Sequence, residues 1–261
     1  MAIKNIRTVK AEKAITDLLT RQDYLITQGN DLAKSFGNLK AFEHRVLDYC
    51  FSFVQKDDKP EQEYEVSTLD IIRNLNLNKS GDSYERVALA LKGLNEKTAM
   101  YSPVTEDGQE GIMMYQLFSN IKFMKDGKTK FTFSKEAAPY VFELVSNYYS
   151  FKLSELSRIK SKYGLILLKL WESKRISPKT ETTIKGTLSE WEDWFLGDND
   201  KLKKSWSAGR FKQQCILSAL KSLNKNFPKV DFYLETIYDH RKTIGFDLTI
   251  TGTPHGKGSK L

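Results

Sequence analysis

The feature that most constrains the fold of this chain is a short internal repeat. Residues 90–97 read ALKGLNEK, and residues 219–226 read ALKSLNKN. A Thr-Leu pair precedes each segment, at residues 68–69 and at residues 187–188. The two matches are offset by 129 and by 119 positions, so the second copy has a longer loop between its paired elements. Two matches in the same order predict two copies of one supersecondary unit.

Apolar periodicity and capping residues give both copies the same order of elements. In the first copy we predict a helix over 39–54, a strand over 64–66, a short helix capped by Ser67 or Thr68, a turn over 76–82, a helix over 84–97 capped by Ser83, and strands over 99–105, 112–124 and 130–133. A further helix is expected over 134–145. In the second copy we predict a helix over 161–176, a polar loop over 178–186, a short helix over 187–197 with a Thr187 cap and Glu190 at the capping-box position, a loop over 198–206, a helix over 207–226, and strands over 231–238 and 244–251.

Helix, short helix, turn, helix and hairpin, in this order, are typical of a winged helix. The sequence therefore predicts an α+β fold of two tandem winged-helix domains. We expect the first domain over 29–145 and the second over 146–252. A helical segment over 1–28 and a flexible tail over 253–261 lie outside them.

Composition excludes several classes of protein. With 40% hydrophobic and 12% aromatic residues, the chain has enough apolar side chains for packed cores. No apolar run approaches the roughly 20 residues of a membrane-spanning helix, and the charged N-terminal stretch does not resemble a signal peptide. We expect a cytoplasmic protein, with Cys50 and Cys215 as buried free thiols.

The positive charge is confined to the second half of the chain. Residues 1–130 hold 19 basic and 19 acidic side chains, whereas residues 131–261 hold 22 basic and 14 acidic ones, which accounts for the net charge of +8. Residues 201–230 contain eight cations and no acid. Such a stretch is typical of proteins that bind a polyanion, most often nucleic acid, although a solvated Lys-rich surface has the same composition.

The helix over 207–226 is predicted to enter the major groove of double-stranded DNA, because it is the second helix of the second helix-turn-helix. Its apolar stripe faces the core, which leaves a basic and amide-rich face outside. Arg matches the O6/N7 pair of guanine and Gln the N6/N7 pair of adenine. The predicted base-reading residues are Ser207, Arg210, Lys212, Gln213, Gln214 and Lys221. A face that only solvates the helix remains the alternative.

Further residues are predicted to contact DNA phosphates. They are Lys203, Lys204 and Ser205 before the base-reading helix, Arg241 and Lys242 in the second wing, Ser161 and Lys162 at a helix start, and Lys79, Ser83 and Arg86 in the first domain. The first-domain helix is less basic, so a protein interface on its outer face is an equally good interpretation.

Catalytic, metal and cofactor sites are not predicted. The three histidines, His44, His240 and His255, are scattered, and the zinc patterns HxH, CxxC and HExxH and the Walker A motif do not occur. Acidic side chains at 190–193 suit a helix N-terminus better than a metal.

Three stretches resemble the replication initiator (Rep) proteins of iteron-containing, theta-replicating bacterial plasmids. They are SKYGLILLKLWES (161–173), GRFKQQCILSALKSLN (209–224) and FYLETIYDHRKTIGFDLTI (232–250). The second is similar to that family's Phe-Lys-Arg-Arg recognition helix, except that Gln213 and Gln214 stand where two basic residues are frequent.

The resemblance implies binding to short direct repeats (iterons) at a plasmid origin, opening of adjacent AT-rich DNA, and recruitment of the host initiator and replicative helicase. It also implies a monomer–dimer equilibrium in which the dimer, formed through the first domain, represses its own gene. The alternatives from the residues are a purely transcriptional repressor, an origin-nicking nuclease, and a scaffold whose basic half binds an acidic protein.

Overall fold

The computed structural model describes residues 25–29, 32, 34–55, 57–142, 148–152, 158–176, 179–197 and 200–253. The helix predicted within 1–24 and almost all of the predicted tail lie outside these residues. The chain divides into two compact units, residues 1–27, 45–138 and 150–157 in one and residues 28–44, 139–149 and 158–261 in the other. Within the described ranges, no helix combines the length and apolarity needed to cross a bilayer.

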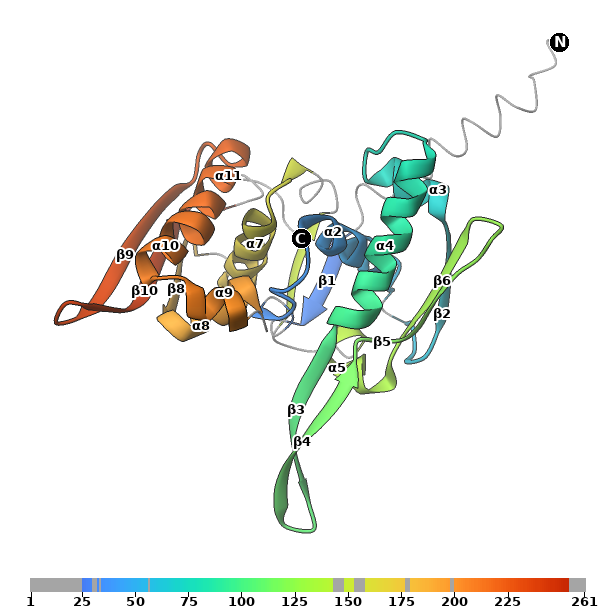
Figure 1. Ribbon diagram of the computed structural model, residues 1–261, viewed down its shortest axis with the longest axis horizontal. Helices are drawn as coiled ribbons and strands as arrows, with labels where there is room; N and C mark the ends of the chain where they lie inside the picture. Colours follow the sequence, from blue (N-terminus) through green and yellow to red (C-terminus); the bar gives the residue numbers. More distant parts are fainter. Residues whose placement is uncertain are drawn as a thin grey trace, which may run out of the picture. The chain divides into compact units, whose positions relative to one another are not determined.

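The first winged helix follows the predicted order and adds one hairpin (Figure 1). Its elements are α2 (Ala41–Phe51), β2 (Glu63–Ser67), α3 (Thr68–Asn74), α4 (Gly81–Lys97), β3 (Ala99–Glu106), β4 (Gln109–Gln116), β5 (Phe118–Phe123) and β6 (Lys128–Phe133). Strands β2, β6 and β5 form one antiparallel sheet in that order, and β3 and β4 pair only with each other. The β3–β4 hairpin projects away from the rest of its unit.

The core of the first unit is largely aromatic. Phe131 and Phe133 of β6 are 0% exposed. Phe131 stacks on Tyr64 of β2 (ring centroids 5.2 Å apart), and Phe133 on Phe118 of β5 (4.9 Å) and against Phe51 of α2 (5.1 Å). Because these rings join α2 to all three strands, they fix the sheet that carries the first wing, β5–β6.

The second winged helix repeats the arrangement. Its elements are α7 (Lys162–Lys174), β8 (Glu181–Thr187), α8 (Leu188–Leu196), α9 (Asp200–Ser205), α10 (Ala208–Phe211), a π-helical turn (Lys212–Leu217), α11 (Ser218–Asn226), β9 (Asp231–Asp239) and β10 (Lys242–Thr251). Its sheet has the order β8-β10-β9, so the strand before the short helix again pairs with the last strand of the hairpin. Two tandem winged helices on an α+β plan are therefore confirmed.

The short helix α8 begins and ends as its sequence predicts. Thr187 and Glu190 form a reciprocal capping box, in which the Thr187 hydroxyl accepts from the Glu190 N–H and the Glu190 carboxylate accepts from the Thr187 N–H (2.8 Å). Gly197 ends the helix with φ 59°. Behind α8, Trp191 donates to the carbonyl of Phe246 on β10 (2.8 Å). Both cysteines are buried free thiols, as expected.

Four sequence predictions about elements were wrong. Ser80, not Ser83, caps α4, and its hydroxyl accepts from the Ser83 N–H. Strand 112–124 is two strands, β4 and β5, separated at Leu117 and placed in different sheets. The loops predicted at 178–186 and 198–206 contain β8 and α9. By contrast, the helix predicted over 134–145 is confirmed in its described part, which is a 3-10 turn at Lys135–Ala137 followed by the single helical turn α5 (Ala138–Val141).

The segment before α2 belongs to the second compact unit, although it precedes the first winged helix in sequence. A Cβ on Gly37 would lie 2.6 Å from both the N of Gly197 and the carbonyl oxygen of Trp194. Backbone therefore meets backbone at the end of α8, an approach that only glycine allows. The units thus differ from the predicted ranges 29–145 and 146–252 at residues 28–44, 139–145 and 150–157. A separate two-stranded sheet pairs β1 (Leu25–Gly29) with β7 (Tyr148–Lys152).

Candidate nucleic-acid interface

The continuous helix from Ala208 to Asn226, here named the reading helix, contains a turn that sequence reasoning missed. Phe211 and Ile216 are both 0% exposed although they are five residues apart. In a regular α-helix they would point about 140° apart. The π-helical turn at Lys212–Leu217 brings both side chains to the buried face of the helix, because its hydrogen bonds span one residue more than those of an α-helix. The five-residue spacing of these two apolar side chains was the sequence signal that could have predicted the π-helical turn.

The outer face of the reading helix is exposed and polar. Arg210, Gln213, Gln214, Ser218 and Lys221 all lie on it. The Arg210 guanidinium lies 5.2 Å from the ring of Trp206, a cation–π contact that holds its plane beside the helix start. Apart from Ser207 and Lys212, the structure therefore brings the predicted base-reading side chains to one helix surface.

Two of the predicted base readers have internal partners. The Ser207 hydroxyl caps the reading helix by accepting from the Arg210 N–H (3.2 Å). Lys212 is half-buried, and its Nζ donates to Thr236 Oγ1 on β9 (2.7 Å). The ammonium of Lys212 thus joins the reading helix to the second wing, β9–β10.

The predicted phosphate contacts of the second unit lie at three places. Lys203 of α9 forms an ion pair with Asp193 of α8, whereas Lys204 beside it is exposed. Arg241 and Lys242 are exposed in the turn of the second wing. The last of the predicted group before the reading helix, Ser205, is also exposed.

The start of α7 is already capped by its own side chain. The Ser161 hydroxyl accepts from the Gly164 N–H (3.3 Å), so one of the free N–H groups at this helix start is used. The ammonium of Lys162 lies 5.4 Å from the ring of Tyr163. The predicted phosphate clamp therefore retains the charge of Lys162 and the remaining N–H groups.

In the first unit, the residues predicted to contact phosphates differ in exposure. Ser83 is 8% exposed and bonded to Ser80, so its hydroxyl faces the protein. Lys79 and Arg86 are exposed. Arg86 also acts on Arg45 of α2: burial and then the neighbouring Arg86 lower the pKa of Arg45.

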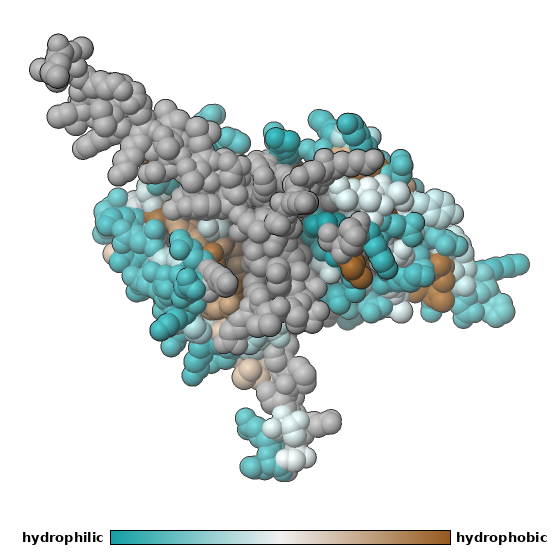
Figure 2. Space-filling model, turned by 180° about the vertical axis from the view of Figure 1, so that it is seen from behind, coloured by the Kyte–Doolittle hydropathy of each residue, from teal (hydrophilic) through white to brown (hydrophobic). Residues whose placement is uncertain are grey.

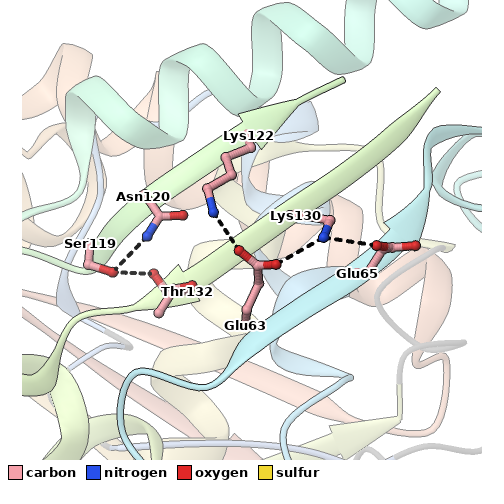
Figure 3. A network of polar contacts seen from close by, with 7 residues as sticks. All are labelled: Glu63, Glu65, Ser119, Asn120, Lys122, Lys130 and Thr132. Atoms are coloured by element: carbon pink, nitrogen blue, oxygen red, sulfur yellow. Dashed lines mark hydrogen bonds and ion pairs between the residues drawn. The ribbon is translucent and has the colours of Figure 1, made fainter. Parts of the chain in front are cut away.

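The first wing carries a ladder of ion pairs on its exposed face, which we name the Glu63–Glu65 ladder (Figure 3). Glu63 accepts from Lys122 (2.6 Å) and Lys130 (3.1 Å), and Glu65 pairs with Lys128 (2.7 Å) and Lys130 (3.2 Å). The hydrogen bonds from Lys122 and Lys130 lower the pKa of Glu63, and those from Lys128 and Lys130 lower that of Glu65. Lysines of the first wing are therefore matched by carboxylates of β2.

In the part of the chain that the structure describes, no group of three or more His, Cys, Asp or Glu side chains is placed to hold an ion. Burial raises the pKa of the Cys215 thiol to about 11, which keeps it protonated and unreactive at neutral pH.

Comparison with known proteins places the chain among replication initiators. The family described as "Initiator Replication protein, WH1" matches residues 25–172, more than half of the 261 residues. The chain belongs to this family. No curated protein matches it.

The solved structure of the Pi initiator protein in complex with iteron DNA is similar to this initiator in fold. The identity is 14%, the TM-score is 0.67, and the match covers 89% of this chain and 98% of that one. Domains 2–3 of RctB also match, with 13% identity, a TM-score of 0.42, and coverage of 82% of this chain and 80% of that one.

Proposed function

We propose that this initiator binds direct repeats in double-stranded DNA at a plasmid origin and performs no catalytic step of its own. The observation that carries the proposal is the outer face of the reading helix, where Arg210, Gln213, Gln214 and Lys221 are exposed within a stretch that contains no acid. The Pi initiator, which has the same fold, was solved on iteron DNA.

In this proposal the second domain reads bases and the first domain contributes backbone contacts. Arg210, Gln213 and Gln214 face the major groove, with Lys221 further along the helix. Lys204, Ser205, Arg241 and Lys242 bind phosphates, together with Lys203 once it exchanges Asp193 for DNA, and with Ser161 and Lys162 at the start of α7. Lys79 and Arg86 add backbone contacts from the first domain. Ser83 leaves the set because its hydroxyl is buried.

Gel-shift titration of the purified chain on the repeats flanking its gene tests this function. We expect binding at least about a thousandfold tighter than to a random duplex of equal length. Equal affinity for both duplexes would contradict the proposal. Incubation with supercoiled origin DNA and Mg²⁺ tests the nuclease alternative, and we expect no nicks.

We further propose that the chain dimerises through its first domain and represses its own gene in that form. The β3–β4 hairpin supports this, because among the described residues each of its strands pairs only with the other, and Met114 on β4 is 72% exposed. Opening of AT-rich DNA and recruitment of the host initiator and helicase complete the proposed role. Loss of a minimal replicon on deletion of the gene distinguishes an initiator from a repressor alone.

A further inference from the structure

The second wing ends in two exposed apolar side chains that the core of its sheet does not use. Tyr238, near the end of β9, is 61% exposed, and Ile244, near the start of β10, is 42% exposed. The buried side chains of β10 come further along the strand, at Phe246, Leu248 and Ile250, all 0% exposed. Figure 2 shows a mainly hydrophilic wing end with an apolar patch close behind it.

A break in strand pairing adds Ile244 to this end. Thr243 pairs with Tyr238 and Gly245 pairs with Ile237, so Ile244 is an extra residue between two ladder positions. Bulges of this kind bend a strand and re-aim the side chains beyond them. The bulge therefore adds a second exposed apolar side chain at the same end of the wing as Tyr238.

Strand alternation puts Tyr238 on the face of the wing that turns toward the reading helix. Thr236 is on that face because it accepts the hydrogen bond from Lys212 of the reading helix (2.7 Å). Side chains two residues apart on a strand share a face, so Tyr238 continues the line from Thr236 toward the wing end. Tyr233 is an odd number of residues away from both Thr236 and Tyr238, so its side chain lies on the opposite face, where it is 68% exposed.

Cations border the apolar pair. Arg241 in the turn and Lys242 at the start of β10 are both exposed. The neighbouring acid, Asp239, lies 3.8 Å from His240 in the same turn. Proteins that enter the minor groove combine these two elements, with cations near the phosphates and apolar side chains against a base step.

We propose that Tyr238, supported by Ile244, is a wedge that enters the minor groove beside the major groove contacted by the reading helix. The inference rests on the proposed function and adds a DNA-deforming site to it. The ring partly unstacks one base step, and the duplex bends away from the wing. Arg241 and Lys242 bind the phosphates on either side of that step.

The test compares Tyr238→Thr with Tyr233→Thr. The control removes an equally exposed tyrosine from the same strand on its other face, and threonine suits a strand in both places. The probe is the duplex that the wild-type chain enriches from a library with a randomised centre, labelled at both ends with a donor and an acceptor dye. Titration gives the affinity, and energy transfer gives the bend.

We expect Tyr238→Thr to bind about tenfold more weakly and to bend the duplex less, with the enriched major-groove bases unchanged. Tyr233→Thr should stay within about twofold of the wild type. Tyr238→Phe keeps the ring and should retain both affinity and bend. Ile244→Thr should act in the same direction as Tyr238→Thr, with a smaller loss of bend.

Two results overturn the inference while leaving the proposed function in place. One is an equal effect of Tyr238→Thr and Tyr233→Thr, and the other is an unbent duplex in the wild-type complex. Enrichment of no motif by the wild-type chain would overturn the proposed function and this inference with it. Thermal melts of the variants show whether the fold is kept, and both tyrosines are exposed enough for that to be expected.

Discussion

The hydrogen bond from Lys212 to Thr236 predicts that the reading helix and the second wing act on DNA as one unit. It is the side-chain bond from the π-helical turn to β9, with Nζ 2.7 Å from Oγ1. Thr236→Val removes the hydroxyl and keeps the shape of the side chain. The perturbation therefore releases the ammonium without opening a cavity.

The structure sets the expected size of the effect. A hydrogen bond from a charged donor contributes roughly 1.5–3 kcal/mol, and partial exposure of both side chains reduces this to about 1 kcal/mol. If the bond holds the wing at the angle that DNA requires, its loss lowers affinity for the enriched duplex about fivefold. Stability of the free protein should fall by no more than about 1 kcal/mol.

A double-mutant cycle with Thr236→Val, Lys212→Met and the double variant isolates the pair. We expect a coupling of about 1 kcal/mol in DNA binding, so the double variant should bind like Lys212→Met alone. Thr249→Val is the control, because Thr249 lies opposite Tyr233 in the sheet, on the face away from the reading helix. Hydroxyl-radical footprints should show protection at the wing contact weakening first.

Additive effects of the two substitutions would refute the reasoning, since independent residues have no coupling energy. A change in the preferred bases with Lys212→Met would instead restore Lys212 to the base-reading set that the sequence predicts. The selection of the enriched motif by that variant decides between the two roles.

Four further predictions concern single residues. Arg210→Ala should lower the ratio of specific to random binding by roughly 1–3 kcal/mol, and an unchanged ratio in gel shifts would mean that the reading helix is misplaced. Lys204→Ala should weaken binding to all duplexes alike and reduce the salt slope by about one, which a slope equal to that of the wild type would contradict. Gly197→Ala should destabilise the second unit by roughly 1–3 kcal/mol in a thermal melt, because its φ is 59° and a Cβ would lie 2.6 Å from Asn38 N. Burial, then Lys169 and Lys162, holds the pKa of His44 well below its usual value, so the native state binds fewer protons than the unfolded state. Stability should therefore fall as the pH drops below about 6.5, and His44→Gln should remove that part of the pH dependence in denaturant titrations.

The sequence predicts the fold well where spacing and capping act locally. The eight-residue match and the Thr187–Glu190 capping box place α8, the reading helix and the hairpins, because these signals depend on neighbours in the chain. Strand β8 was missed because Ile184 is its only large apolar residue. Its inward positions are Thr182 and Ile184, and a buried threonine cannot be told from a loop threonine without the neighbouring strand.

The partners of side chains are the part that the sequence does not determine. Ser80 and Ser83 are both good caps, and the choice between them depends on where the chain turns into α4. Lys212 has the residue type and the helix position of a base reader, yet its ammonium reaches β9, 24 positions away. Long-range contacts of this kind follow only from the sheet register.

The two wings differ in where their cations lie. Lys122, Lys128 and Lys130 of the first hairpin are bonded to Glu63 and Glu65, whereas Arg241 and Lys242 at the end of the second are exposed. Pairing within the Glu63–Glu65 ladder removes most of the field that a phosphate would experience, because opposite charges at 2.6–3.2 Å cancel at longer range. The same fold thus pairs the strand lysines of one wing internally and leaves two cations exposed at the end of the other. This difference supports the proposed DNA contact of the second wing and the proposed protein contact of the first domain.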